Sequence, residues 1–392
     1  MERKRVRDVA SIYRGVSYKK AQSSKTRLDN YIAVLRANNI SKGVFINDDL
    51  VFVPQDLVSD NQLVFKDDIV ITMSSGSKSH VGKVAIAKET ANYAFGAFCA
   101  KISPYGVDPY YLYYILLSDD FRKHIEAHCK GTNINNIKQS YILDYEIPIP
   151  SITKQKLIVK EIEESLSQLD SAVATLNKTK QQLEIYRQAV LREVFTKCDQ
   201  SVEIKTVCKH VTDGDHMPPP KAKTGIPFIM ISNIDGNTID WSDTAFVGKE
   251  YYNNIGDKRT PQKGDVLYTV TGSFGIPVLI DFEKAFCFQR HIALLRPNDK
   301  IEQEFLYYAL QDSTVYAQAS KRATGTAQKT VGLTVLRTIK IPFTESKEKQ
   351  TKMVSIIKNR LSQCDIVEKT VNQSLQQAEA LRQSILKQAF EG

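Results

Sequence analysis

The chain lacks any apolar run that approaches the roughly 18 residues a membrane-spanning helix needs. Its six cysteines include no Cys-x-x-Cys pair, so the spacing disfavours a zinc ribbon, and we expect free, buried thiols. The basic start, Met1–Arg7, is not followed by an apolar segment, which disfavours a secretory signal. These absences predict a soluble, cytoplasmic protein whose 392 residues suffice for two domains and connecting elements.

The usual signatures of catalysis are also missing. An adenine methyltransferase needs an Asp/Asn/Ser-Pro-Pro-Tyr/Phe segment, and the nearest string, Met217–Pro220, lacks both the polar residue and the aromatic ring. Gly325–Thr330 lacks the glycine that precedes the lysine of a phosphate-binding loop. His124 and His128 would share a helix face, but no third metal ligand follows at a motif spacing. We therefore expect no catalytic residue, no metal ligand and no bound cofactor in this chain.

What the chain does contain is a repeat. Leu166–Asp170 returns as Leu361–Asp365, 195 positions later. The same offset relates Gln155 to Gln350, Arg187-Gln188 to Arg382-Gln383, and Phe195 to Phe390. Each copy follows an Ile-Pro pair and a mixed segment long enough to form a domain. An internal duplication explains this pattern, and it predicts the order globular, helix, globular, helix.

The repeated stretches have the composition and periodicity of long helices. Both lack Pro and Gly, and their apolar residues recur at alternating spacings of three and four, which indicates a narrow heptad seam. About 44 residues at 1.5 Å each give a rod of roughly 65 Å. The predicted seam comprises Ile162, Leu166, Leu169, Val173, Leu176 and Leu183 in the first copy and Ile357, Leu361, Val371 and Leu375 in the second.

The partner that best buries such a seam is the other copy. An antiparallel pair relates the two halves by a pseudo-two-fold axis and needs no second chain. If the helix midpoints coincide, Lys180 faces Glu368, while Arg187 and Arg382 lack partners. The alternative is that each helix packs on its own domain.

The globular halves share a skeleton despite their divergence. Residues 66–72 and 263–269 each read as a turn feeding a β-strand, and a second strand follows in both copies. Further on, 110–116 and 304–310 predict amphipathic helices whose tyrosines belong to the core. The fold class is therefore α+β, with mixed domains over 1–150 and 197–345 and long helices over 151–196 and 346–392.

The formal charge of +9 is uneven along the chain. Residues 1–154 contain 21 Lys and Arg against 16 Asp and Glu, whereas 155–195 contain six of each kind. A basic first domain suits a polyanionic partner. A solvated basic surface explains the same excess about as well.

The order of these elements resembles the DNA-specificity subunits of type I restriction–modification systems. The features that match are the Ile-Pro pair followed by Gln155 or Gln350, the helix endings Arg187–Leu191 and Arg382–Leu386, the segment Val211–Pro219, and the strand Gly264–Thr269. Val211–Pro219 looks like the Asp-Gly-x-His-x-x-Pro segment of that family. The first half departs from the family pattern, because Gly15–Tyr18 stands where that segment would be.

The resemblance implies two target-recognition domains joined by two antiparallel helices, each domain reading one half of a split double-stranded DNA site. Two modification subunits using S-adenosylmethionine, and restriction subunits using ATP and Mg²⁺, would methylate adenine and cut DNA, so this chain is not an enzyme. The alternatives are a two-module protein-interaction adapter and a methyltransferase with degenerate motifs.

Basic side chains would hold phosphates, while Arg, Lys, Asn and Gln reach base edges. The DNA-contact candidates are Arg27, Arg36, Asn38, Lys78 and His80 in the first half and Lys221, Lys223, Asn233, Arg259 and Arg290 in the second.

Overall fold

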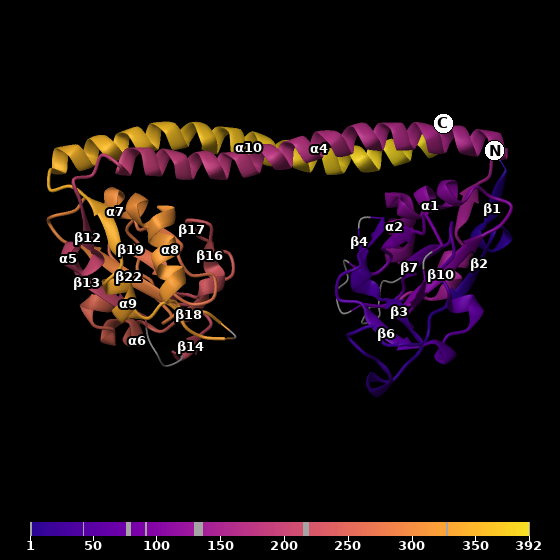
Figure 1. Cartoon of the computed structure of the whole chain (residues 1–392), viewed down its shortest axis with the longest axis horizontal. Helices are drawn as coiled ribbons and strands as arrows, with labels where there is room; N and C mark the ends of the chain where they lie inside the picture. Colours follow the sequence, from indigo (N-terminus) through magenta and orange to yellow (C-terminus); the bar gives the residue numbers. More distant parts are fainter. Residues whose placement is uncertain are drawn as a thin grey trace. The chain divides into compact units, whose positions relative to one another are not determined.

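The computed structural model describes residues 2–41, 43–75, 80–90, 92–128, 136–214, 219–326 and 328–391. The chain divides into two compact units (Figure 1). Unit 1 comprises Met1–Leu176 and Gln373–Gly392, and unit 2 comprises Asn177–Asn372. The two long helices, α4 (Ile152–Phe195) and α10 (Lys347–Glu391), each contribute residues to both units. The prediction of two long helices following two mixed domains is confirmed.

The domain of unit 1 is built on two small sheets. A four-stranded antiparallel sheet has the order β2-β10-β7-β8, and a three-stranded sheet has the order β6-β3-β9, in which β3 and β9 are parallel. A short pair, β1 and β11, precedes the entry into α4. The strands are β1 (Arg3–Arg5), β2 (Ala10–Arg14), β3 (Tyr31–Leu35), β4 (Ile40–Ser41), β5 (Val44–Phe45), β6 (Val51–Pro54), β7 (Ile69–Thr72), β8 (Val84–Ile86), β9 (Tyr93–Phe95), β10 (Cys99–Pro104) and β11 (Glu146–Pro148), and the helices are α1 (Pro109–Leu117), α2 (Asp119–His128) and α3 (Gln139–Leu143).

The domain of unit 2 repeats this topology. Its four-stranded sheet is β13-β22-β19-β20, its second sheet is β14-β18-β15-β21 with β15 and β21 parallel, and β12 pairs with β23. The strands are β12 (Gln200–Glu203), β13 (Cys208–Asp213), β14 (Lys221–Ala222), β15 (Ile226–Ile229), β16 (Ile234–Asp235), β17 (Thr238–Ile239), β18 (Ala245–Val247), β19 (Val266–Thr269), β20 (Pro277–Leu279), β21 (Cys287–Phe288), β22 (Ile292–Pro297) and β23 (Lys340–Phe343), and the helices are α5 (Ile204–Val207), α6 (Lys249–Asn254), α7 (Gln303–Leu310), α8 (Ser313–Arg322) and α9 (Leu333–Arg337).

The predicted turn-and-strand units exist in both domains as β7–β8 and β19–β20 hairpins. Before each hairpin, one turn residue has positive φ, 72° at Asp67 and 95° at Gly264. The next residue is a buried aspartate paired with a cation, at 3.2 Å for Asp68–Lys101 and 2.8 Å for Asp265–Arg296. Each aspartate also accepts a backbone N–H of its own turn at 2.8 Å. In each domain, a buried ion pair with satisfied hydrogen bonds therefore stabilises the equivalent turn.

The predicted helices over 110–116 and 304–310 are α1 and α7. The helix α7 is amphipathic as expected, with Phe305, Leu306, Ala309 and Leu310 buried. The same prediction is wrong for α1, in which all six residues from Tyr111 to Leu116 are buried. The reason is that α1 belongs to a core that also contains the end of α10, where Tyr111 meets Phe390 edge-on at 5.4 Å. The tyrosines are core residues, as predicted.

The long helices pair with each other and also complete the domain cores. In unit 1, Ile162 and Leu166 of α4 join Leu386 of α10 in the core under α1. In unit 2, Val190 and Val194 of α4 join Ile357 of α10 in the corresponding core. Packing on the other helix and packing on a domain therefore occur together. Of the seam positions, Ile162, Leu166, Leu169, Ile357, Leu361 and Val371 are buried, and Val173, Leu176, Leu183 and Leu375 are half-buried.

The helices run antiparallel within each unit, but the expected register is wrong by four residues, about one helical turn, because Lys180 lies by Asn372 and not by Glu368. Arg187, not Lys180, lies opposite Glu368, at 2.9 Å, and it also contacts Asp365 at 2.6 Å. Lys180 donates instead to Asn372 at 3.2 Å. In unit 1 Arg382 pairs with Asp170, the counterpart of Asp365 at an offset of 195. Aligning the helix midpoints left both arginines unpaired, whereas the observed register gives both a carboxylate.

Two buried glutamines join the helix starts to the domains. Gln155 accepts the N–H of Asp108, the residue that caps α1, at 2.8 Å, and donates to the Pro150 carbonyl at 2.8 Å. Gln350 accepts the N–H of Glu302, which precedes α7, at 2.7 Å. It donates to the carbonyls of Lys300 and Thr344 at 2.9 and 2.7 Å. The repeated glutamines thus perform the same structural task in both units.

Other sequence expectations concern the thiols and the histidine pair. Cys99, Cys208 and Cys364 are buried and free, Cys287 is buried with its Sγ 3.7 Å from the Pro227 carbonyl oxygen, Cys198 is free and half-buried, and Cys129 lies outside the described residues. His124 donates to the Tyr141 carbonyl at 2.9 Å, as a packing histidine does. Within the described ranges, no group of three or more potential metal ligands gathers, and no helix is long and apolar enough to cross a membrane.

Candidate nucleic-acid interface

Each domain presents a four-residue turn between equivalent strands. In unit 1 the turn is Gly96–Cys99, closed by the Cys99 N–H donating to the Gly96 carbonyl at 2.8 Å. In unit 2 it is Gln289–Ile292, closed in the same way at 3.1 Å. An i to i+3 hydrogen bond of this kind defines a β-turn. We call these two segments the tip turns.

Matching backbone hydrogen bonds hold both tip turns to the sheets. The Met73 N–H donates to the Phe98 carbonyl at 2.8 Å, and the Val270 N–H donates to the His291 carbonyl at 2.9 Å. The first residue of each turn donates to a strand of the neighbouring sheet, to Leu35 at 2.8 Å or to Ile229 at 3.0 Å. The two turns are therefore the same scaffold with different side chains.

A glycine packs directly beneath each tip turn. A Cβ at Gly15 would lie 2.1 Å from the Gly96 carbonyl oxygen, and one at Gly214 would lie 2.0 Å from the Phe288 carbonyl oxygen. Both approaches are far closer than any real side-chain carbon tolerates. Gly214 is the glycine of the Asp-Gly segment, and Gly15 is its counterpart in the half that lacks the rest of that motif. Asp215–Pro218 lie outside the described residues.

The tip turn of unit 1 borders a cleft of about 780 Å³. Arg36, Asn38 and His80, three of the predicted DNA-contact residues, line it together with Tyr18 and Phe98. The Arg36 guanidinium lies 2.9 Å from the Asp49 carboxylate and keeps 31% of its side chain exposed. Burial raises the pKa of Tyr18 above its usual value, against the opposing effect of Arg36, so its hydroxyl is neutral. The cleft offers donors, acceptors and one large apolar ring.

The tip turn of unit 2 borders a smaller cleft of about 400 Å³. Its lining includes Arg290 and His291 of the turn, Asp213 of β13 and Thr271 of the loop after β19. Arg259 approaches this site from outside, with its guanidinium 3.8 Å from the Asp213 carboxylate. Two of the second-half candidates, Arg290 and Arg259, therefore gather around one cleft.

Asn233 has a role different from the one predicted. It is 3% exposed, and its amide donates to the carbonyls of Asp240 and Asp243 at 3.3 and 3.0 Å. Its oxygen accepts the Met230 N–H at 2.9 Å. Asn39 makes the same contacts in unit 1, to the carbonyls of Ile46 and Asp48 and the N–H of Arg36. The prediction of a base contact is wrong for Asn233, because folding of the surrounding loop already satisfies the amide.

The remaining DNA-contact candidates either do not line these clefts or lie outside the described residues. Arg27 and Lys223 are exposed on their domains. Lys78 and the side chain of Lys221 lie outside the described residues. Phe98, 66% exposed, is a cleft residue that the sequence reasoning missed. Its sequence signal is its place directly after Gly96-Ala97, at the start of a buried strand.

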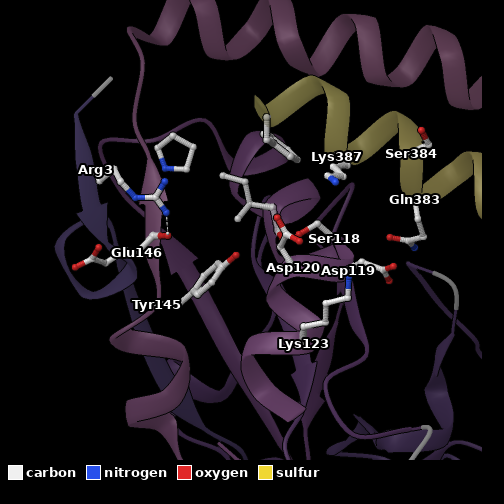
Figure 2. Close-up of a pocket in the computed structure, with 13 residues that line it drawn as sticks. Arg3, Ser118, Asp119, Asp120, Lys123, Tyr145, Glu146, Gln383, Ser384 and Lys387 are labelled. Atoms are coloured by element: carbon white, nitrogen blue, oxygen red, sulfur yellow. Dashed lines mark hydrogen bonds between the residues drawn. The ribbon is translucent and has the colours of Figure 1, made fainter. Parts of the chain in front are cut away.

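A second pocket, of about 330 Å³, lies in unit 1 where the last turns of α10 meet α1 and α2 (Figure 2). Asp119, Asp120 and Lys123 of α2 lie near Lys387 of α10 (Figure 2). Acidic and basic groups alternate on its walls. Such a surface suits a protein neighbour better than a phosphate backbone, which favours cations alone.

Comparison with known proteins defines the class. The family model described as the type I restriction modification DNA specificity domain matches residues 1–185 and again 200–377. The specificity subunit of the type I restriction enzyme StySPI from Salmonella potsdam is 32% identical, with 99% of this chain and 88% of that protein covered. The EcoKI specificity subunit from Escherichia coli K12 is 31% identical over the same shares.

A solved structure has the same fold. It comes from a study of complex assembly and conformational transition in a type I restriction–modification system, with a TM-score of 0.73, 17% identity, and 99% and 97% of the two chains covered. The present chain belongs to the type I restriction–modification specificity subunits. It supplies DNA sequence specificity, and the protein-interaction adapter is not favoured.

Proposed function

We propose that each domain reads one half of a split double-stranded DNA target through the cleft beneath its tip turn. The observation that carries this proposal is the pairing of identical backbone scaffolds with different side chains, Ala97-Phe98 in one and Arg290-His291 in the other. Two readers of one design that recognise different sequences should differ in this way. Arg36, His80 and Arg259 supply positive or hydrogen-bonding groups at the rims of the clefts.

The helix pair is proposed to set the distance between the half-sites. The 44 residues of α4 correspond to about 65 Å of helix, and the ion pairs of Arg187 and Arg382 hold one register. If the helix pair sets this distance, the spacer between the two half-sites has a fixed length.

Separate subunits are proposed to supply the chemistry. Modification subunits that use S-adenosylmethionine would methylate adenine, and restriction subunits that use ATP and Mg²⁺ would cleave the DNA, while this chain catalyses neither step. Ile185, Tyr186, Ile366 and Val367 in unit 2 leave large apolar groups exposed on the helix pair, the most open being Ile185 at 70%. Exposed apolar surface of this kind marks a protein contact, and we assign it to the modification subunits.

The test is a methylome of cells that express the chain with its partner subunits. A single split motif with a fixed spacer is the expected result. Exchange of residues 1–150 for those of a relative should change one half of the motif and preserve the other. An altered second half-site, or methylation by the partners at the same motif without this chain, contradicts the proposal. Loss of methylation in cells that lack the chain but retain its partners is the matched control.

A further inference from the structure

The central positions of the two tip turns differ in chemistry although their backbones match. Ala97 and Phe98 occupy these positions in unit 1, and Arg290 and His291 occupy them in unit 2. Met73 and Val270 donate to the carbonyl of the second central residue at 2.8 and 2.9 Å. Because the main chain is held equally in both domains, the difference between the turns lies in the side chains.

Phe98 is exposed to a degree that the domain's own packing does not explain. Its side chain is 66% accessible, more than that of any other large apolar residue in the described part of unit 1. Exposing a phenyl ring forgoes most of the stabilisation that burying it would contribute. The turn holds the ring at the rim of the cleft lined by Arg36 and His80. The ring stands among cationic and polar groups. It therefore suits a ligand that carries negative charge along its surface and exposes one apolar group for the ring to contact.

DNA meets that description in its major groove. There the thymine 5-methyl group is the one base-edge feature that is recognised without a hydrogen bond. Ala97 and Phe98 offer apolar side chains and no side-chain donor. Arg290 is exposed and offers a planar fork of donors, the group that suits the O6 and N7 atoms of guanine.

We propose that the two central residues of each tip turn determine one position of the corresponding half-site. Phe98 contacts the 5-methyl group of a thymine in the half-site read by unit 1. Arg290 contacts a guanine in the half-site read by unit 2. This inference rests on the proposed function and names the base contacts within it.

The experiment begins with the wild-type complex, whose methylome gives the motif. Absence of a split motif at this stage overturns the proposed function itself. With a split motif in hand, each thymine of the first half-site is replaced by deoxyuridine, which removes only the methyl group, and the affinity of the complex is measured. One replacement should weaken binding about fourfold, the factor that corresponds to one buried methyl group.

Phe98→Ala and Arg290→Ala then assign the contacts. With Phe98→Ala, the same deoxyuridine replacement should have no effect, and the second half-site should be unchanged. With Arg290→Ala, preference for guanine at one position of the second half-site should fall about tenfold or more, and the first half-site should be unchanged. Leu28→Ala, which removes another exposed apolar side chain of the same domain that does not line the cleft, is the matched control and should leave the thymine effect intact.

Folding is controlled by the melting temperature of each variant, which should equal that of the wild type because both side chains are exposed. Phe98→Leu, which keeps an apolar contact, should retain part of the deoxyuridine effect. Insensitivity of the wild type to every deoxyuridine replacement, or an unchanged effect in Phe98→Ala, overturns the assignment of Phe98. A third outcome would also overturn the assignment of Phe98: the wild type bends DNA, Phe98→Ala abolishes the bend, and deoxyuridine has no effect. In that case the ring acts as a wedge between bases. A motif unaltered by Arg290→Ala overturns the assignment of Arg290.

Discussion

Replacement of Gln350 by methionine tests how the helices are attached to the domains. Methionine has nearly the same shape but makes none of the three hydrogen bonds. The side chain is 0% exposed, so the Glu302 N–H and the carbonyls of Lys300 and Thr344 would lose their partner out of reach of solvent. Each such group costs about 1 to 3 kcal/mol. Allowing for some relaxation, we expect a loss of about 3 to 5 kcal/mol in the free energy of unfolding of unit 2.

The companion variant Gln155→Met should cost less. Gln155 serves two groups, the Asp108 N–H and the Pro150 carbonyl, so about 2 to 3 kcal/mol is expected in unit 1. Gln363→Met, on the exposed face of α10, is the matched control and should change stability by less than about 0.5 kcal/mol.

The assay is urea unfolding followed by tryptophan fluorescence. Trp241 is the single tryptophan of the chain, and it lies in unit 2 against Phe282 and Phe286, so its emission reports that unit. Gln350→Met should lower the midpoint of the Trp241 transition. Gln155→Met should affect chiefly the amide hydrogen exchange of unit 1. A Gln350→Met midpoint within error of the Gln363→Met control would refute the reasoning, and so would a larger loss in Gln155→Met than in Gln350→Met.

Two further predictions concern the tip turn and the helix pair. Gly214→Ala should destabilise unit 2 by about 1 to 3 kcal/mol or more, because the new Cβ would collide with the Phe288 carbonyl. The control is Gly256→Ala, which should be tolerated because a Cβ there meets no atom within 4 Å. Equal melting temperatures of the two variants would contradict this prediction. Insertion of one heptad into each long helix, near Thr175 and Thr370, adds roughly 10 Å to the helix pair. The spacer of the methylated motif should lengthen by up to about three base pairs, and neither half-site should change. An unchanged spacer would contradict the proposal that the helix pair sets the distance between the half-sites.

The features predicted most successfully from the sequence are those that local chemistry dictates and the duplication repeats. The long helices follow from a seam sustained over many turns without proline or glycine. The hairpins follow from a charged turn before a β-branched run, seen once at Asp68 and again at Asp265. Because the pattern occurs in both halves of the chain, each copy supports the structural prediction made from the other.

The failures concern contacts that depend on tertiary structure. An amide such as Asn233 looks available in a sequence, but the loop around η7 (Ile231–Asn233) binds both of its N–H groups and its oxygen. Phe98 looks like a core residue because it stands at the start of a buried strand, and its place directly after Gly96-Ala97 is the one sign in the sequence that it belongs to a turn. The helix α1 was expected to be amphipathic, since its sequence does not reveal that a second buried surface comes from the far end of the chain.

The register of the helices shows how a duplicated sequence resolves an ambiguity that periodicity leaves. A heptad seam fits its partner equally well after any slip of seven residues, so apolar contacts alone do not select one pairing. Arg187 is only 19% exposed, and leaving such a cation unpaired is costly. The observed register gives it Asp365 and Glu368, and the duplication gives Arg382 the counterpart, Asp170. A slip of one heptad would remove both sets at once. Because the arginine and its aspartate were duplicated together, one interaction specifies the register in both units.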